Sequence, residues 1–204
     1  MRRWLVAAVV PVLAGCGYNR SQTYDEQVNA FKSQIEVQLQ RRADLVPNLV
    51  ETVRGFAQQE QQVFGAVADA RARLGGAVQS HSLGQMAEAN VALSGALSRL
   101  IAIAEAYPDL KSNQNFRALQ DQLEGTENRI STARQDYNTA VQAYNAYIRR
   151  FPVVITAKII GKGAREYFEV TEPGAREVPR VNFGQPAAPT FTIATEPASL
   201  PRRS

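Results

Sequence analysis

The chain has 204 residues, 45% of them hydrophobic, with 23 basic and 19 acidic side chains and a formal charge of +4. This length suits one ordinary domain with appendages, and the hydrophobic content is enough for a packed core. The small basic excess forms no stripe with interleaved aromatics, which argues against nucleic-acid binding. The chain has one cysteine and one histidine, which excludes a disulfide framework. It also lacks the set of ligands for a typical zinc site and the residues expected of a Cys–His hydrolase.

The N-terminus has the features of a secretory signal. A basic pair precedes an apolar run over residues 4–13, which is shorter than the roughly 20 residues of a membrane span. The sequence Leu-Ala-Gly-Cys16 then resembles the lipobox of bacterial lipoproteins. We therefore predict a lipoprotein signal peptide over residues 1–15 and a tether over residues 16–23. Cys16 would carry acyl chains such as palmitate and become the first residue of the mature protein.

This anchor predicts a location in the cell envelope. Arginines at the N-terminus favour an orientation with the N-terminus in the cytoplasm and the domain on the outer side of the membrane. Gly17 follows the cysteine, so no aspartate retention signal is present. In a cell with two membranes, we expect the outer membrane, with the domain in the periplasm. The alternative is an uncleaved helix that crosses the inner membrane once.

Heptad-like apolar spacing predicts four long helices between residues 24 and 151. Their expected ranges are Tyr24–Asp44, Pro47–Leu74, Leu83–Tyr107 and Phe116–Phe151. The first break is placed at Pro47 because a proline inside a helix costs ~3 kcal/mol and Asp44 can cap a restart; one long kinked helix is the alternative. Short connections favour antiparallel neighbours, so the sequence predicts an all-α fold: an up-and-down antiparallel four-helix bundle with coiled-coil-like packing.

The pattern changes after Pro152. Residues 153–160 are a short apolar run that fits either a strand or a short helix packed on the end of the bundle. Tyr167 and Phe168 are expected to tuck back as the last ordered residues. Residues 170–204 hold six of the ten prolines and show no helical period, so we predict a Pro-rich disordered tail.

Several sequence blocks resemble the LemA family. They are Leu39–Val53, Ala106–Phe116, Leu123–Ile130 with Ala133–Asn138, Tyr144-Asn145, Arg149, Phe151-Pro152 and Tyr167–Glu169. The resemblance implies a helical bundle domain over residues 24–169, an N-terminal membrane segment and no defined catalytic activity. It also implies a setting near membrane metalloproteases, since genes of the family often lie beside theirs. The short signal departs from the longer uncleaved helix of a typical member.

Polar residues interrupt the apolar seam within these blocks. The heptad that starts at Val28 places Arg42 at a core position, where an unpaired charge would cost several kcal/mol. Glu127 or a neighbouring carboxylate is the expected partner. The seam is either a charge network that fixes helix register or a polar ligand pocket. Its candidate residues are Arg41, Arg42, Asp44, Asn48, Glu124, Glu127, Asn128, Arg129 and Arg134.

The sequence shows no nucleophile with a base, no metal-ligand spacing and no phosphate-binding glycine loop, so we predict a non-enzyme without cofactor or metal. The predicted function is a membrane-anchored helical scaffold of the bacterial cell envelope that contacts an unidentified envelope protein. One alternative is an accessory or substrate adaptor of a membrane metalloprotease. The other is a small-molecule binder, which a concave cavity at the polar seam would favour.

Overall fold

The computed structural model describes residues 2–169, with side chains from residue 17 onward, and this part of the chain is all-helical. The prediction of an all-α fold is confirmed. The apolar run after Pro152 forms a helix and not a strand. The predicted tail over residues 170–204 lies outside the described residues. The six helices are α1 (Arg2–Arg54), α2 (Gln61–Gln79), α3 (Leu83–Ala106), α4 (Pro108–Ser112), α5 (Gln114–Ile148) and α6 (Val153–Ile159).

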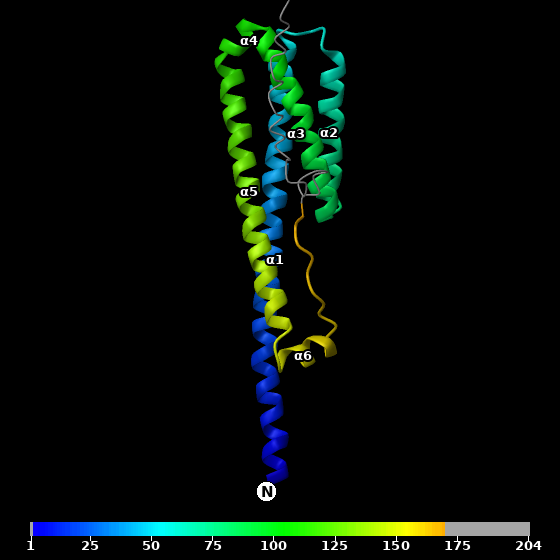
Figure 1. Ribbon diagram of the computed structural model, residues 1–204, viewed down its shortest axis with the longest axis vertical. Coiled ribbons are helices and arrows are strands. Elements are labelled where there is room, and N and C mark those ends of the chain that lie inside the picture. The colour runs from blue at the N-terminus through cyan, green and yellow to red at the C-terminus, as the bar shows by residue number, and fades with distance from the viewer. Residues whose placement is uncertain (1, 170–204) are drawn as a thin grey trace, which may run out of the picture. The chain divides into compact units, whose positions relative to one another are not determined.

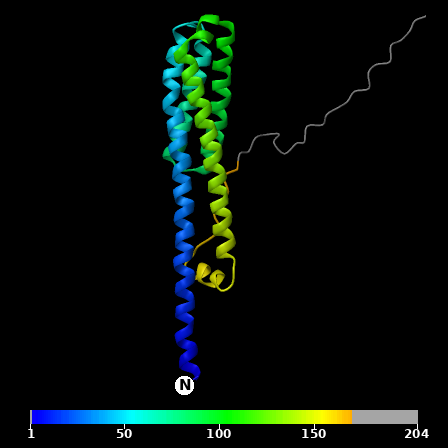
Figure 2. The same ribbon diagram turned by 90° about the vertical axis from the view of Figure 1, so that its left-hand side faces the viewer.

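The helices are arranged around α1, which contacts α2, α3, α5 and α6 (Figure 1). Helix α5 runs antiparallel beside α1, while α2 and α3 form a hairpin against the C-terminal part of α1 (Figure 2). The loop of this hairpin reaches α1 at Lys32, whose ammonium donates to the His81 carbonyl, and at Glu36, which pairs with the His81 ring. The hairpin therefore leaves the N-terminal part of the α1–α5 pair uncovered.

The core follows a heptad on α1. One core position of the heptad is occupied by the buried residues Val28, Ile35 and Leu49, and the second core position by Leu39, Val46 and Val53. Arg42 occupies the position between Ile35 and Leu49, as the sequence pattern predicts. Helix α3 supplies Leu93, Leu97 and Leu100 to the same core. Among the described residues, α3 is also the one helix long and apolar enough to cross a membrane, a property that core helices share.

Pro47 does not end the first helix. The prediction of a break near Asp44 is wrong, because α1 continues to Arg54 and the chain turns at residues 55–60. Asp44 is not a cap, and its carboxylate accepts from Gln40 within the helix. A proline at position 47 leaves the Ala43 carbonyl without its helical donor. Arg71 of α2 replaces that donor, with its Nε 2.9 Å from the Ala43 oxygen.

The other helix ends are set by local contacts. Helix α2 runs through Gly75 and Gly76, where an end was expected, and stops at Gln79 before His81, whose φ of 53° reverses the chain. Ser82 caps α3 by accepting from the Gln85 amide. Asn113 caps α5 by accepting from the Phe116 amide at 3.1 Å.

We predict that Arg71 stabilises the fold only because position 47 is proline. Arg71→Leu should lower the free energy of unfolding by ~1 kcal/mol, the net value of one hydrogen bond. In a Pro47→Ala background the residue 47 amide can satisfy Ala43, so the same change should cost much less. Thermal melts of the four chains measure this difference, with Arg73→Leu as the control on the same helix. An equal cost of Arg71→Leu in both backgrounds would contradict the compensation.

Candidate functional site

Arg42 joins three helices at the centre of the seam. Its side chain comes from the inner face of α1, and the residue is 5% exposed. Nη1 donates to Asn90 Oδ1 of α3 at 2.6 Å and pairs with the carboxylate of Glu127 on α5. Burial lowers the pKa of the Arg42 guanidinium, and the nearby Glu127 carboxylate opposes that shift. The side chain remains charged, because an arginine pKa starts far above neutral pH.

The two charges of this pair are unequally buried. Arg42 is almost fully enclosed, whereas the Glu127 side chain is 41% exposed. Removal of one charge therefore leaves a buried, unpaired partner only where Arg42 is the residue that remains. Water can reach Glu127 when its partner is removed, but a guanidinium without Glu127 keeps only the neutral Asn90 amide.

The remaining predicted seam residues do not gather around Arg42. Arg41, Asp44, Asn48, Glu124, Asn128 and Arg129 are exposed. The Glu124 carboxylate accepts from Gln120 on the same helix at 3.2 Å, and Asn128 and Arg129 line an open depression between α5 and α1. Arg134 is half-buried, with its guanidinium carbon 4.8 Å from the centroid of the Phe168 ring. Within residues 17–169, no group of three His, Cys, Asp or Glu side chains is placed to hold a metal ion.

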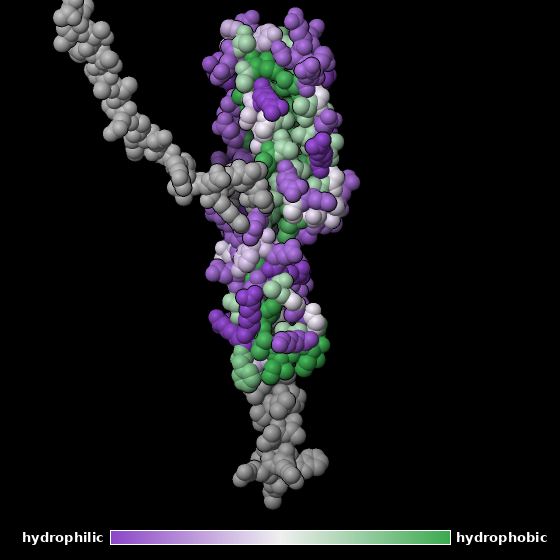
Figure 3. Space-filling model, turned by 45° about the vertical axis from the view of Figure 1, so that its right-hand side comes forward, coloured by the Kyte–Doolittle hydropathy of each residue, from purple (hydrophilic) through white to green (hydrophobic). Residues whose placement is uncertain are grey.

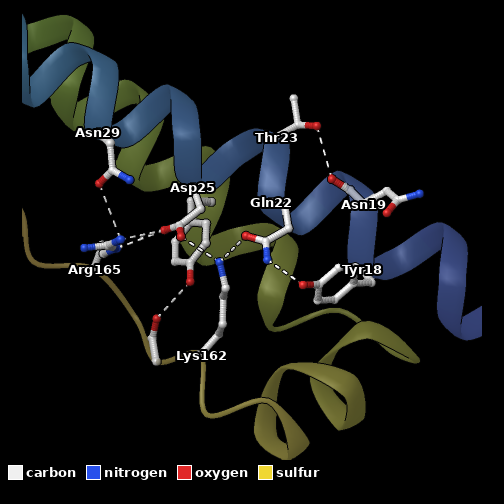
Figure 4. Close-up of polar contacts among 10 residues, drawn as sticks. Tyr18, Asn19, Gln22, Thr23, Asp25, Asn29, Lys162 and Arg165 are labelled. Atoms are coloured by element: carbon white, nitrogen blue, oxygen red, sulfur yellow. Dashed lines mark hydrogen bonds and ion pairs between the residues drawn. The ribbon is translucent and has the colours of Figure 1, made fainter.

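A second polar site was missed by the sequence analysis. We use the name strap for residues 160–169, which follow α6 and return along the uncovered part of the α1–α5 pair (Figure 1). The strap is fixed to α1 by Asp25, whose side chain is 14% exposed. Figure 4 shows its carboxylate between the two basic side chains of the strap. Lys162 Nζ lies 2.6 Å from Oδ2, and Arg165 Nη2 lies 2.7 Å from Oδ1.

The electrostatics of Asp25 favour its charged form. Burial alone would raise the pKa of this carboxyl, but the hydrogen bonds from Lys162 and Arg165 outweigh burial and hold the pKa below its usual value. Lys162 Nζ also donates to Gln22 Oε1 at 2.6 Å. One α1 carboxylate thus holds two strap residues in a fixed position.

Two asparagines of α5 bind the strap backbone. Asn145 Oδ1 accepts from the Arg165 amide at 2.8 Å, and its Nδ2 donates to the Arg165 carbonyl at 2.9 Å. Asn138 makes the same pair of bonds with Phe168, at 2.8 and 3.1 Å. Seven residues of helix rise about 10.5 Å, and three residues of extended chain span about 10 Å. The two spacings therefore match.

The residue before each of these asparagines on α5 is a tyrosine that also binds the strap backbone. The Tyr144 hydroxyl donates to the Gly163 carbonyl at 3.3 Å, and the Tyr137 hydroxyl to the Glu166 carbonyl at 2.9 Å. Burial raises the pKa of both hydroxyls, so they remain donors. We name these two α5 sequences, Tyr137-Asn138 and Tyr144-Asn145, the clamps. Their seven-residue repeat was the signal in the sequence that could have located the strap.

The aromatic residues at the end of the strap differ in burial. Phe168 is 6% exposed and packs in the core, as expected, but Tyr167 is 45% exposed. This difference follows from the clamp geometry, since an extended chain places neighbouring side chains on opposite sides.

We predict an unequal response to loss of the two seam charges. Glu127→Leu should destabilise the domain by ~3–5 kcal/mol, because it leaves a buried guanidinium unpaired, and Arg42→Met should cost less. The double variant should recover much of the loss. Thermal or denaturant unfolding of the four chains gives the coupling energy. Near-wild-type stability of the Glu127→Leu chain would contradict the register-fixing role of the pair and favour a pocket.

The sequence was compared with known families and proteins. The model of the LemA family matches residues 31–183. Magnetosome proteins MamQ 1 and MamQ 2 of Paramagnetospirillum magneticum are each 32% identical over 180 residues, covering 77% of this chain and 66% of the relative. Magnetosome protein MamQ of Magnetospirillum gryphiswaldense is 30% identical over 193 residues, covering 83% of this chain and 70% of the relative. The chain thus spans just under two thirds of the length of the first two relatives.

Proposed function

The chain belongs to the LemA family, and on that premise we propose that it is a non-catalytic helical scaffold anchored to a membrane of the bacterial cell envelope. One observation carries the proposal. Helix α1 runs without a break from Arg2 to Arg54, so the N-terminal segment and the core helix of the domain are continuous. A continuous helix holds the domain at a fixed height above its anchor, as a scaffold requires.

The anchor that we propose is an acylated Cys16. More than one acyl chain is needed for stable attachment, and a lipobox cysteine normally carries more than one. The mature α1 would then begin at Cys16, and the predicted tether over residues 16–23 is the first part of this helix. We place the protein in the outer membrane, facing the periplasm, where two membranes exist. In the single-pass alternative, the N-terminal part of the same helix crosses the inner membrane, and the rest of the helix continues into the domain.

Beyond Lys32, we propose that α1, α2, α3 and α5 work as an antiparallel four-helix bundle whose register is fixed at Arg42. The seam is filled by the chain's own groups, since Arg42 contacts Asn90 and Glu127. This packing supports a structural role for the seam and does not favour a small-molecule site there.

The surface that we propose for an envelope partner is the α2–α3 track, an open hollow between these two helices. It is lined by Ala70, Ala92, Gly95 and Ala96, together with Asp69, Arg73 and Arg99. Ala92 also lines the two adjoining depressions, so the hollow continues along α3. Small side chains let a partner helix approach closely, and the flanking arginines can bind its carboxylates. A membrane metalloprotease is one candidate partner, which would make the protein its adaptor.

We predict that a photo-crosslinking residue at Ala92 captures an envelope protein in cells, whereas the same residue at Val37, on the exposed face of α1, does not. Gly95→Leu should abolish the capture with little change in melting temperature, because a Cβ at Gly95 has open space around it, with no atom outside the helix's own backbone within 4 Å. Mass spectrometry of crosslinked membranes identifies the captured protein. Equal capture at Ala92 and Val37, or capture that persists in the Gly95→Leu chain, would reject this surface.

A further inference from the structure

Helix α6 and the residues on either side of it expose a cluster of large apolar side chains. We name Phe151, Ile155, Ile159 and Ile160 the α6 patch, and their exposed fractions range from 40% to 81%. Ile155 and Ile159 are four residues apart on one face of the helix, while Ala157 on the opposite side is buried in the domain. Figure 3 shows hydrophobic side chains gathered at the end of the described domain where α6 lies. Clusters of this kind usually mark an interaction surface.

The α6 patch lies level with the start of the folded domain. The Tyr147 hydroxyl donates to the Gly17 carbonyl at 3.3 Å. A Cβ at Gly17 would lie 3.3 Å from Val153 Cγ2 in the first turn of α6. Gly17 directly follows Cys16, so either anchor, acyl chains on Cys16 or an apolar helix that ends near it, brings this level to the membrane surface.

The charges around the patch suit an anionic surface. Between residues 147 and 164 the chain has four basic residues and no acidic residue. Arg149, Arg150 and Lys158 are exposed beside the patch, while Lys162 pairs with Asp25. Residues 17–24 of α1, next to α6, add Arg20 and no acidic side chain. Basic groups around an exposed apolar face are typical of helices that lie in the lipid headgroup region.

We propose that the α6 patch is a second membrane contact, which inserts shallowly into an anionic lipid surface beside the anchor. This inference rests on the proposed membrane anchor and adds to it a defined face and orientation. The strap and the clamps hold α6 against α1, so the patch cannot turn away from the membrane without loss of those bonds. With two contacts, the domain stands on the membrane in one orientation.

Tryptophan fluorescence in vesicles tests the proposal. The chain is purified from membranes with its anchor, carries Trp4→Phe so that an uncleaved form has no other tryptophan, and is reconstituted into phosphatidylcholine–phosphatidylglycerol vesicles with brominated acyl chains. The fluorescence of the Ile159→Trp chain should be quenched several times more strongly than that of the Val37→Trp chain. Val37 is exposed on α1, about 30 Å along the helix from Gly17. The combined changes Arg149→Gln, Arg150→Gln and Lys158→Gln should reduce the quenching of the Ile159→Trp chain. Circular dichroism melts confirm that each chain is folded, and Ile155→Trp replaces Ile159→Trp if that chain is not.

Flotation of the vesicles reports the anchor separately. Chains that float with the vesicles but show equal, weak quenching at positions 159 and 37 overturn the α6 contact and leave the anchor standing. Chains that do not float overturn both. A blue-shifted but unquenched Ile159→Trp signal that depends on protein concentration would show a second copy on the patch and overturn the lipid contact.

Discussion

The end of the domain near Gly17 depends on the two clamps of α5. The α2–α3 hairpin stops at Lys32 and Glu36, and two helices alone cannot enclose an apolar core. The strap supplies the third side of the α1–α5 pair, as an extended segment whose backbone groups are satisfied by side chains. Asn138 and Asn145 each take one amide and one carbonyl of the strap, which is the role a neighbouring strand would have in a sheet.

In each half of the domain, one charged side chain of α1 thus connects this helix to the segments packed against it. Beyond the hairpin loop, Arg42 connects α1 to α3 and α5. Toward the N-terminus, Asp25 connects α1 to the strap, and the strap holds α6 at the level of Gly17. The two groups have opposite signs: Arg42 pairs with the Glu127 carboxylate, and Asp25 pairs with Lys162 and Arg165 of the strap. In our proposal, these two groups fix the α1–α5 register and present the α2–α3 track outward from the membrane.

The sequence predicted the features that follow from periodicity. The heptad from Val28 placed Arg42 at the core. Local rules failed where a distant side chain changed the outcome. Pro47 remains inside a helix because Arg71, 24 residues later, replaces the missing donor. The strap was missed for a related reason: its residues have no period of their own, and only the pairing with α5 gives them a structure. The repeat of Tyr-Asn at seven residues was visible, but nothing in the sequence stated what it binds.

Amide hydrogen exchange across the strap tests the central claim most directly. In the wild-type chain, the Arg165 and Phe168 amides should exchange slowly, because each is bonded to an asparagine of α5. In an Asn138→Leu, Asn145→Leu chain, these amides should exchange at rates close to those of free peptide, while amides near Leu97 in α3 stay protected. Asn128→Leu, on the exposed face of α5, should change neither region. Continued protection of Arg165 and Phe168 without the two asparagines would contradict the claim that the clamps hold the strap.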